Sequence, residues 1–297
     1  GLNISSTFNT AKVIYIFVPL VIIPQLLFSG VIVKFDKLHP SLSHATEVPM
    51  IGNAMPSRWA YEALIVEQTS QNELSSQFLK FDILKSQATW KKDYWLPKLQ
   101  NELNVLVNKK SSTLQKNVAR ELLANEMKKE DLIWTDLKCI SCLENLSFPD
   151  ITEEEIKPIN SFLSILRKQY IYTINTSIDS IRIRKEKMGL EKYRNLRNEY
   201  TNESLINILT NKLELNKTIT LNAELYQNSD PIYNLPKKRS FFNSHFYSPY
   251  KYIFGKRIST FYANLLVIWG MVFLGYFLLY FDVFKKLFWR LLSIIPK

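Results

Sequence analysis

The sequence contains few of the residues that usually perform catalysis or bind metals. Among 297 residues there are seven glycines, three histidines and two cysteines. The glycines never form the G-x-x-x-x-G-K-[ST] loop that cradles a phosphate. His39 and His44 supply too few ligands for a metal site, and no nucleophile is paired with a base. We therefore expect no catalytic, cofactor-binding or metal-binding residues, and a soluble enzyme is disfavoured.

The two cysteines form one C-x-x-C motif, Cys139 and Cys142. A structural zinc ion normally needs a second pair of ligands nearby, and the sequence offers none. A thioredoxin-like redox site needs a βαβ setting, which the surrounding pattern lacks. Two interpretations stay open: a local disulfide in an oxidising external space, or two small buried thiols.

Long apolar runs are present near both ends. Val13–Val33 has Gln25 and Ser29 as its only clearly polar side chains, and Phe261–Phe281 is equally apolar. Each run has about 21 residues, enough to cross a hydrocarbon layer of roughly 30 Å as a helix. Two core helices of a soluble protein are the alternative, but core helices rarely stay apolar on every face over this length. We expect an integral membrane protein with two transmembrane helices.

Two prolines, Pro19 and Pro24, lie inside the first run. Each removes a backbone donor and crowds the carbonyl four residues earlier, so a bend or a local unwinding is expected. Membranes tolerate such a defect where neighbouring helices or a cavity receive the freed carbonyls. The first span is therefore a candidate for lining a path, the alternative being a harmless kink.

A short helix is predicted at Pro56–Gln68, after a stretch broken by prolines. Trp59, Ala63 and Val66 would lie along one side of it. Its first turns also carry charge, and the spacing of Arg58 and Glu62 allows them to pair on the helix surface.

Two aromatic residues of this helix, Trp59 and Tyr61, are of the kind that favours the membrane–water interface. We interpret the helix as one that lies at, or dips into, the outer leaflet as a re-entrant element.

The middle of the chain, residues 72–245, changes to a polar composition with apolar residues at helical spacing. Period-two alternation is scarce, so we expect a helical extracytoplasmic insert and a mainly α fold. The predicted helices are Trp90–Asn108, Ser111–Lys129, a long helix that begins near Thr152, Ser204–Leu215 and Thr218–Gln227.

The long helix has the clearest pattern. Thr152 followed by Glu155 fits a capping box. Pro158 would fall in the second turn, which indicates a start further along the chain. The apolar stripe at steps of three and four residues comprises Ile159, Leu163, Leu166, Tyr170, Ile174, Ile178 and Ile181.

The last part of the chain, residues 246–297, returns to the membrane. Asp230–Gly255 is rich in Pro, Tyr and Phe, and is either an irregular connector or a segment on the headgroup layer. After the second span, Lys285, Lys286 and Arg290 alternate with apolar residues as a short basic amphipathic tail. With residues 1–71 holding the first span and the re-entrant segment, the chain has three parts.

The net charge of +11 indicates anionic lipid and solvent rather than nucleic acid, because the basic residues are interspersed with Glu and no nucleic-acid motif accompanies them. The short flank after the second span is basic, whereas long loops are largely exempt from the positive-inside rule. Both ends are therefore expected in the cytoplasm, with residues about 34–257 outside.

Two motifs resemble the ABCG-type (type V) ABC exporter permeases. In that family the fifth transmembrane helix ends in an apolar-Ser-Gly-apolar-apolar pattern, here Phe28-Ser29-Gly30-Val31-Ile32. A re-entrant helix with Pro, Arg and an aromatic residue follows, here Pro56-Ser57-Arg58-Trp59-Ala60-Tyr61-Glu62-Ala63-Leu64. The sixth helix and a short cytoplasmic tail then end those proteins. The large insert departs from the well-known eukaryotic members and resembles long half-transporters of the Bacteroidetes type.

The resemblance implies a half-transporter in a bacterial inner membrane that works as a dimer, most simply a homodimer. ATP and Mg would bind to a partner nucleotide-binding domain encoded before Gly1. By position, Val31 and Ile32 would form an outer gate just beyond Ser29 and Gly30. The residues that would face the cavity or dimer seam are Leu20, Ile23 and Leu27, with lipid contact or helix packing as the alternative.

A second hypothesis from a different class stays open. The chain could be a membrane-anchored interaction or sensor protein, whose helical external domain binds a partner without transport.

Overall fold

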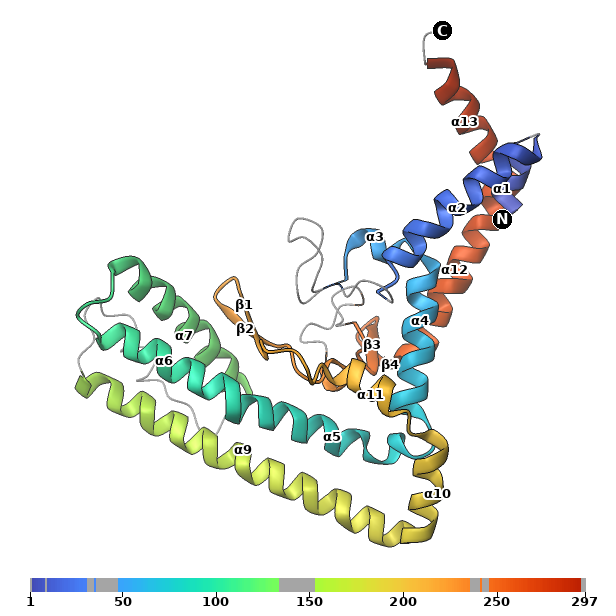
Figure 1. Ribbon diagram of the computed structural model, residues 1–297. Coiled ribbons are helices and arrows are strands. Elements are labelled where there is room, and N and C mark those ends of the chain that lie inside the picture. The colour runs from blue at the N-terminus through green and yellow to red at the C-terminus, as the bar shows by residue number, and fades with distance from the viewer. Residues whose placement is uncertain are drawn as a thin grey trace. The chain divides into compact units, whose positions relative to one another are not determined.

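The computed structural model describes residues 2–8, 10–30, 35, 48–133, 153–235, 241 and 246–294. These residues are mainly helical, as predicted, with two short β-hairpins (Figure 1). The chain divides into two compact units: unit 1 comprises Gly1–Gln68 and Leu235–Lys297, and unit 2 comprises Thr69–Asn234. The sequence had suggested boundaries at 71/72 and 245/246.

Unit 1 contains both apolar helices. Its short helix α4 packs along α12, while α1 packs against α12 and α13 (Figure 1). The elements of unit 1 are α1 Leu2–Thr7, α2 Ala11–Leu27, α3 Met50–Asn53, α4 Pro56–Val66, β3 Tyr250–Ile253, β4 Lys256–Ser259, α12 Thr260–Tyr280 and α13 Val283–Ile294.

Helix α2 differs from the predicted span Val13–Val33. It begins at Ala11 and ends at Leu27, and a turn follows at 28–30. Gly30 has φ +80°, a conformation that ends a right-handed helix and that glycine adopts without strain. The helix continues through Pro19 and Pro24, so the local unwinding predicted there is not found. At 17 residues, α2 is shorter than the roughly 20 residues of a typical span.

Helix α12 begins within one residue of the predicted second span. It has 21 residues with a mean hydropathy of 1.9, and only 11% of its apolar window is buried inside the structure. A helix of this length rises roughly 30 Å, the thickness of a bilayer core. Within the described part of the chain, α12 alone is long and apolar enough to cross a membrane. Asp282, with φ +52°, separates it from α13.

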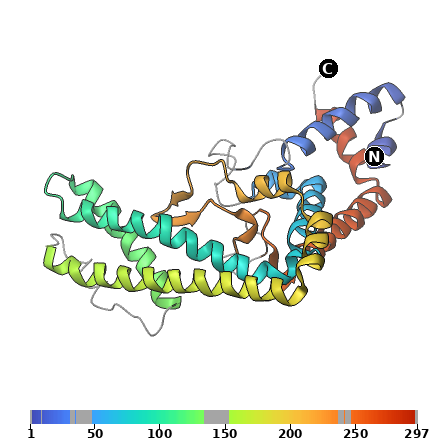
Figure 2. The same cartoon turned by 60° about the horizontal axis from the view of Figure 1, so that its bottom comes forward.

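Unit 2 is built from long helices. Figures 1 and 2 show α5 and α6 running beside α9. The predicted helix Trp90–Asn108 is part of a longer helical run that begins at Ser75 and passes through a π-helical turn. The elements are η2 Glu67–Gln71 (which crosses the unit boundary), α5 Ser75–Trp90, η3 Lys91–Trp95, α6 Leu96–Val107, α7 Thr113–Ile133, α9 Glu153–Met188, α10 Leu190–Tyr200, α11 Glu203–Thr210 and η5 Pro231–Tyr233.

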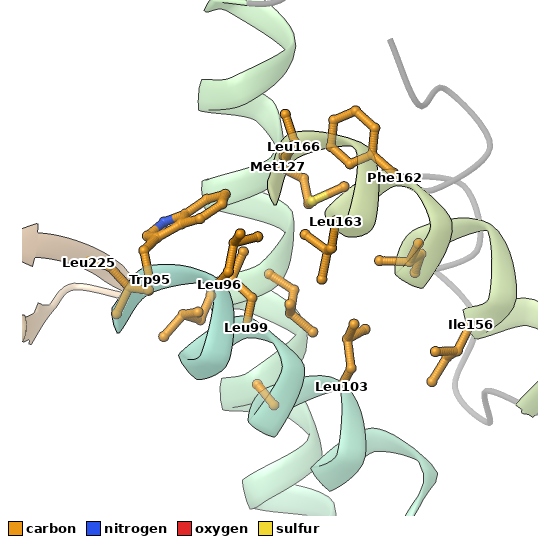
Figure 3. Close-up of a cluster of buried hydrophobic side chains, with 14 of the residues drawn as sticks. Trp95, Leu96, Leu99, Leu103, Met127, Ile156, Phe162, Leu163, Leu166 and Leu225 are labelled. Atoms are coloured by element: carbon orange, nitrogen blue, oxygen red, sulfur yellow. The ribbon is translucent and has the colours of Figure 1, made fainter. Parts of the chain in front are cut away.

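The main core of unit 2 lies where α6, α7 and α9 meet, with Leu225 from the β1–β2 hairpin (Figure 3). The first half of the predicted α9 stripe, from Ile159 to Tyr170, is buried there. Helix α9 begins at Glu153 and includes Pro158, so the prediction of a later start is wrong. Ile156 is already buried in the core, and this packing offsets the hydrogen bond that the proline removes.

The predicted helix Thr218–Gln227 is also wrong, because this segment is an antiparallel hairpin of β1 (Thr218–Leu221) and β2 (Glu224–Gln227). Its turn residues Asn222 and Ala223 have φ values of +50° and +54°, as a two-residue hairpin of type I′ requires. The sequence Thr-Ile-Thr-Leu alternates β-branched and apolar residues, a signal for a strand that four residues make easy to miss.

The preceding helix α11 is shorter than the predicted Ser204–Leu215. It ends at Thr210 because Asn211 takes a left-handed conformation. A second hairpin, β3–β4, occupies part of the segment Asp230–Gly255 that was interpreted as irregular or lying on headgroups.

A buried carboxylate fastens the β1–β2 hairpin to the core of unit 2. Glu126 on α7 is 3% exposed. It accepts hydrogen bonds from Trp95 Nε1 at 2.7 Å and from the Leu225 backbone N–H at 2.8 Å. Lys129 Nζ lies 2.7 Å from the same carboxylate. The side chain thus joins η3, α7 and β2, whose donors would otherwise be buried without partners.

We expect Glu126→Ala to lower the free energy of unfolding by roughly 3 kcal/mol, because two buried N–H donors lose their acceptor. Hydrogen–deuterium exchange should show faster exchange of the Leu225 amide. Glu121→Ala, an exposed position on the same helix, is the matched control and should change neither quantity. Unchanged exchange at Leu225 would contradict the role of Glu126.

Candidate functional site

Helix α4 is hydrogen-bonded to both apolar helices of unit 1. Pro56 occupies its first position, where a missing N–H costs nothing. Ser57 Oγ then donates to the Gln25 carbonyl of α2 at 2.9 Å. Asn264 Nδ2 of α12 donates to the Trp59 carbonyl at 3.0 Å. The end of α2 and the start of α12, far apart in the sequence, are therefore joined through α4.

Four polar side chains meet where α4 faces the start of α12, and we call them the charge cluster: Arg58, Glu62, Lys251 and Asn264. Lys251 Nζ lies 2.6 Å from Glu62 Oε2, and Asn264 Nδ2 donates to the same oxygen at 2.8 Å. Arg58 Nη1 lies 3.5 Å from it. One carboxylate oxygen thus accepts hydrogen bonds from β3 and α12 and lies beside the Arg58 guanidinium of α4.

The charge cluster is buried. Arg58 is 2% exposed, and Glu62, Lys251 and Asn264 have no exposed surface. The sequence predicted the Arg58–Glu62 pair correctly, but on a helix surface, and that placement is wrong. Trp59 is only 1% exposed, so its indole ring packs inside the protein.

Aromatic rings replace water around the cations. The Arg58 guanidinium carbon lies 3.8 Å from the centre of the Trp59 ring, and Lys251 Nζ lies 4.6 Å from it. The Phe241 ring stacks on Trp59 with centroids 5.6 Å apart, and the indole N–H donates to the Asn53 carbonyl at 2.8 Å. Cation–π attraction is stronger in such desolvated surroundings than at a surface.

Burial and charge oppose one another in this cluster. Burial lowers the pKa of Lys251 to about 8, although the Glu62 carboxylate beside it acts in the other direction. For Glu62, burial by itself would raise the pKa, but the charges of Arg58 and Lys251 lower it below its ordinary value. The two neighbouring cations thus favour the ionised form of the Glu62 carboxylate.

The charge cluster joins α4, β3 and α12 through an ion pair and hydrogen bonds. All three histidines of the sequence lie outside the described residues. Among the residues that the structure describes, no three His, Cys, Asp or Glu side chains come together as a metal site requires. The C-x-x-C pair Cys139 and Cys142 also lies outside them, so a disulfide and two buried thiols both stay open.

The turn after α2 is tightly packed. Ser29 is 1% exposed and its Oγ donates to the Leu26 carbonyl at 2.7 Å. A Cβ atom on Gly30 would lie 2.7 Å from Phe246 Cε1 and 2.9 Å from Phe35 Cε2. No side chain fits in that space. The predicted gate residues Val31 and Ile32 follow this turn and lie outside the described residues.

The predicted pathway residues of α2 face away from the rest of the chain. Leu20, Ile23 and Leu27 are 62%, 56% and 41% exposed. Their spacing of three and four residues places them on one side of the helix. The described residues leave this apolar side of α2 uncovered, as they do the rest of the helix, which has no buried residue.

Two members of the charge cluster, Asn264 and Lys251, were not predicted from the sequence. Asn264 is an amide five residues into an apolar helix, and a polar residue in such a helix is by itself a signal of a specific partner. Lys251 lies in the alternating stretch Tyr-Lys-Tyr-Ile, which indicates a strand. Its partner Glu62 could not be identified, because 189 positions separate them.

No family model matches the chain, and no curated protein and no solved structure matches it either. The resemblance to ABCG-type permeases therefore stays a hypothesis, and it rests on the two sequence motifs described above.

We expect Gly30→Ala to destabilise the protein by about 2 kcal/mol or more, because the new methyl group meets two aromatic rings and φ is positive. Gly270→Ala on α12 is the matched control, since a Cβ there meets nothing within 4 Å and alanine favours a helix. Thermal unfolding in detergent measures both variants. Equal midpoints for the two variants would contradict the crowding at Gly30.

We expect Glu62→Gln to lower the free energy of unfolding by about 3–5 kcal/mol, because Arg58 and Lys251 would stay buried without a counter-charge. Glu186→Gln, at an exposed position of α9, should have little effect. Chemical denaturation in detergent compares them. The charge cluster would lose its assigned importance if both variants unfolded at the same denaturant concentration.

Proposed function

We propose that this chain is the C-terminal transmembrane part of an ATP-driven exporter permease of the ABCG type. The observation that carries the proposal is the placement of α4. It lies between the end of α2 and the start of α12 and is hydrogen-bonded to both. This is the order expected for a fifth helix, a re-entrant helix and a sixth helix.

A membrane explains the apolar surface of unit 1. Tyr15, Leu266 and Phe273 are examples of large side chains on α2 and α12 that are 58–78% exposed. An exposed apolar surface of this extent is costly in water and stable in lipid or against other membrane helices. In this proposal the 17-residue helix α2 would form the second transmembrane span.

The two ends of unit 1 support the proposed topology. The N-terminal helix α1 packs against α12 and α13, and Asn3 Nδ2 donates to the Gly275 carbonyl at 3.0 Å. In this proposal both chain ends would lie on one side of the membrane, the cytoplasmic side that the basic residues of α13 favour. Residues of about 34–257 would then be outside.

In the dimer, the apolar stripes of the two α2 helices would face one another across the substrate pathway. Leu20, Ile23 and Leu27 would line it, and Val31 and Ile32 would close its outer end. A ring of branched side chains at a two-fold axis excludes water until the helices separate. ATP hydrolysis would take place in a nucleotide-binding domain encoded before Gly1.

Helix α4 would transmit the movement of α2. Ser57 fastens it to the outer end of α2, and the charge cluster fastens it to α12 and β3. The buried ion pairs resist separation, because pulling a partner away leaves an uncompensated charge. Displacement of the outer end of α2 would therefore move α4 and the start of α12 together.

We expect Ile23→Cys to form a disulfide-linked dimer in membranes treated with copper phenanthroline, in the full protein with Cys139 and Cys142 replaced by Ser. Val18→Cys is the matched control, because Val18 is also exposed and lies on the opposite side of α2. Cross-linking of both positions to the same extent, or of neither, would contradict the proposed seam.

The coding sequence before Gly1 separates this proposal from the anchored sensor. A nucleotide-binding loop and four further spans are expected there for the exporter. A kinase domain or a stop codon would support the sensor.

A further inference from the structure

The β3–β4 hairpin presents an aromatic side chain that none of the described residues covers. Phe254 occupies the first position of its two-residue turn and is 102% exposed. The turn has φ values of +49° at Phe254 and +77° at Gly255. Asparagine or glycine is favoured at such positions, and phenylalanine there is strained. In water, a strained Phe whose side chain packs against nothing adds no stability to the fold.

The base of the hairpin is held rigidly. Lys251 on β3 pairs with Glu62 at 2.6 Å, and the Thr260 N–H donates to the Pro249 carbonyl at 3.2 Å. Strand β4 has four residues and leads directly into α12. At roughly 3.4 Å per residue, Phe254 lies within about 20 Å of the start of α12.

The surroundings of Phe254 are cationic. Lys256 and Arg257 are exposed, and the Arg257 guanidinium lies 3.5 Å from the centre of the Tyr250 ring. Between Asp230 and Asp282 the sequence contains no acidic residue. A phosphate-bearing surface would therefore meet cations and aromatic rings here, and no repelling carboxylate on this stretch of the chain.

We propose that the hairpin tip is a phospholipid anchor. Phe254 inserts at the boundary between headgroups and acyl chains, while Lys256 and Arg257 bind lipid phosphates. Aromatic residues beside cations are the residue types that stabilise proteins at this layer. The inference rests on the proposed crossing of the membrane by α12, which would put the tip within about 20 Å of the point where the chain enters the bilayer.

Site-specific fluorescence tests the anchor. In the full chain with Cys139 and Cys142 replaced by Ser, Phe254→Cys is labelled with NBD and reconstituted into phosphatidylethanolamine–phosphatidylglycerol vesicles. We expect blue-shifted emission and at least a two-fold loss of fluorescence with lipids that carry a 5-doxyl group. Leu213→Cys in unit 2, where Leu213 is 96% exposed, is the control and should report water.

A label in α12 separates this inference from the proposed function. NBD at Phe273→Cys should be quenched by 12-doxyl lipid if α12 crosses the membrane. Quenching at 273 without quenching at 254 would overturn the anchor and leave the span intact. Quenching at neither position would overturn both. Blue-shifted but unquenched emission at 254 would show a protein partner in place of lipid and would also overturn the anchor.

Two further variants separate lipid binding from a structural role. Phe254→Asn suits the turn, so its unfolding midpoint in detergent should equal or exceed that of the unchanged protein. Added phosphatidylglycerol should raise the unfolding midpoint of this variant less than that of the unchanged protein. In the labelled protein, Lys256→Gln with Arg257→Gln should reduce quenching at 254. A lower midpoint of Phe254→Asn in detergent, with unchanged lipid dependence, would assign Phe254 a structural role and overturn the anchor.

Discussion

The carboxylate of Glu62 is the group on which the arrangement of unit 1 depends. It has no exposed surface, and its Oε2 contacts Lys251 and Asn264 at 2.6 and 2.8 Å. Removing three charges from water is expensive, and only close geometry recovers that cost. Such a cluster contributes little net stability compared with an apolar core of the same size. It does exclude other arrangements, because any displacement of α4, β3 or α12 would leave a buried charge without a partner.

The two apolar helices of unit 1 meet the rest of the chain differently from core helices. Helix α12 is covered on one face only, by α4 near its start and by α1 near its end, where Asn3 reaches Gly275. Its other faces remain apolar and exposed, as do Leu20 and Ile23 of α2. The polar contacts are concentrated at helix ends, and the long apolar surfaces between them are suited to lipid or to further membrane helices.

Unit 2 folds around a core of its own. Leu99, Leu123 and Leu163, from three different helices, are almost completely buried in one cluster, and Glu126 adds a polar connection between η3, α7 and β2. In the sequence, unit 2 begins after Gln68 and ends before Leu235. A domain with its own core can be inserted between two segments of another unit and fold around that core.

The sequence by itself determined the mainly helical class, the apolar helix near the C-terminus and the stripe from Ile159 to Tyr170. These follow from local periodicity and from the length of apolar runs, which each segment carries independently of the others. The early end of α2 was missed, because the conformation of Gly30 is enforced by Phe246 and Phe35 from elsewhere in the chain. The two hairpins were missed because four-residue strands carry too little pattern.

Only the tertiary structure decided that the Arg58–Glu62 pair is buried and that Lys251 and Asn264 complete it. Spacing within a helix shows that two charges can meet, but not whether water surrounds them. That depends on which other segments pack over them. Lys251 is 189 positions from Glu62, and a contact over such a separation forms only when the whole of unit 1 has folded around it.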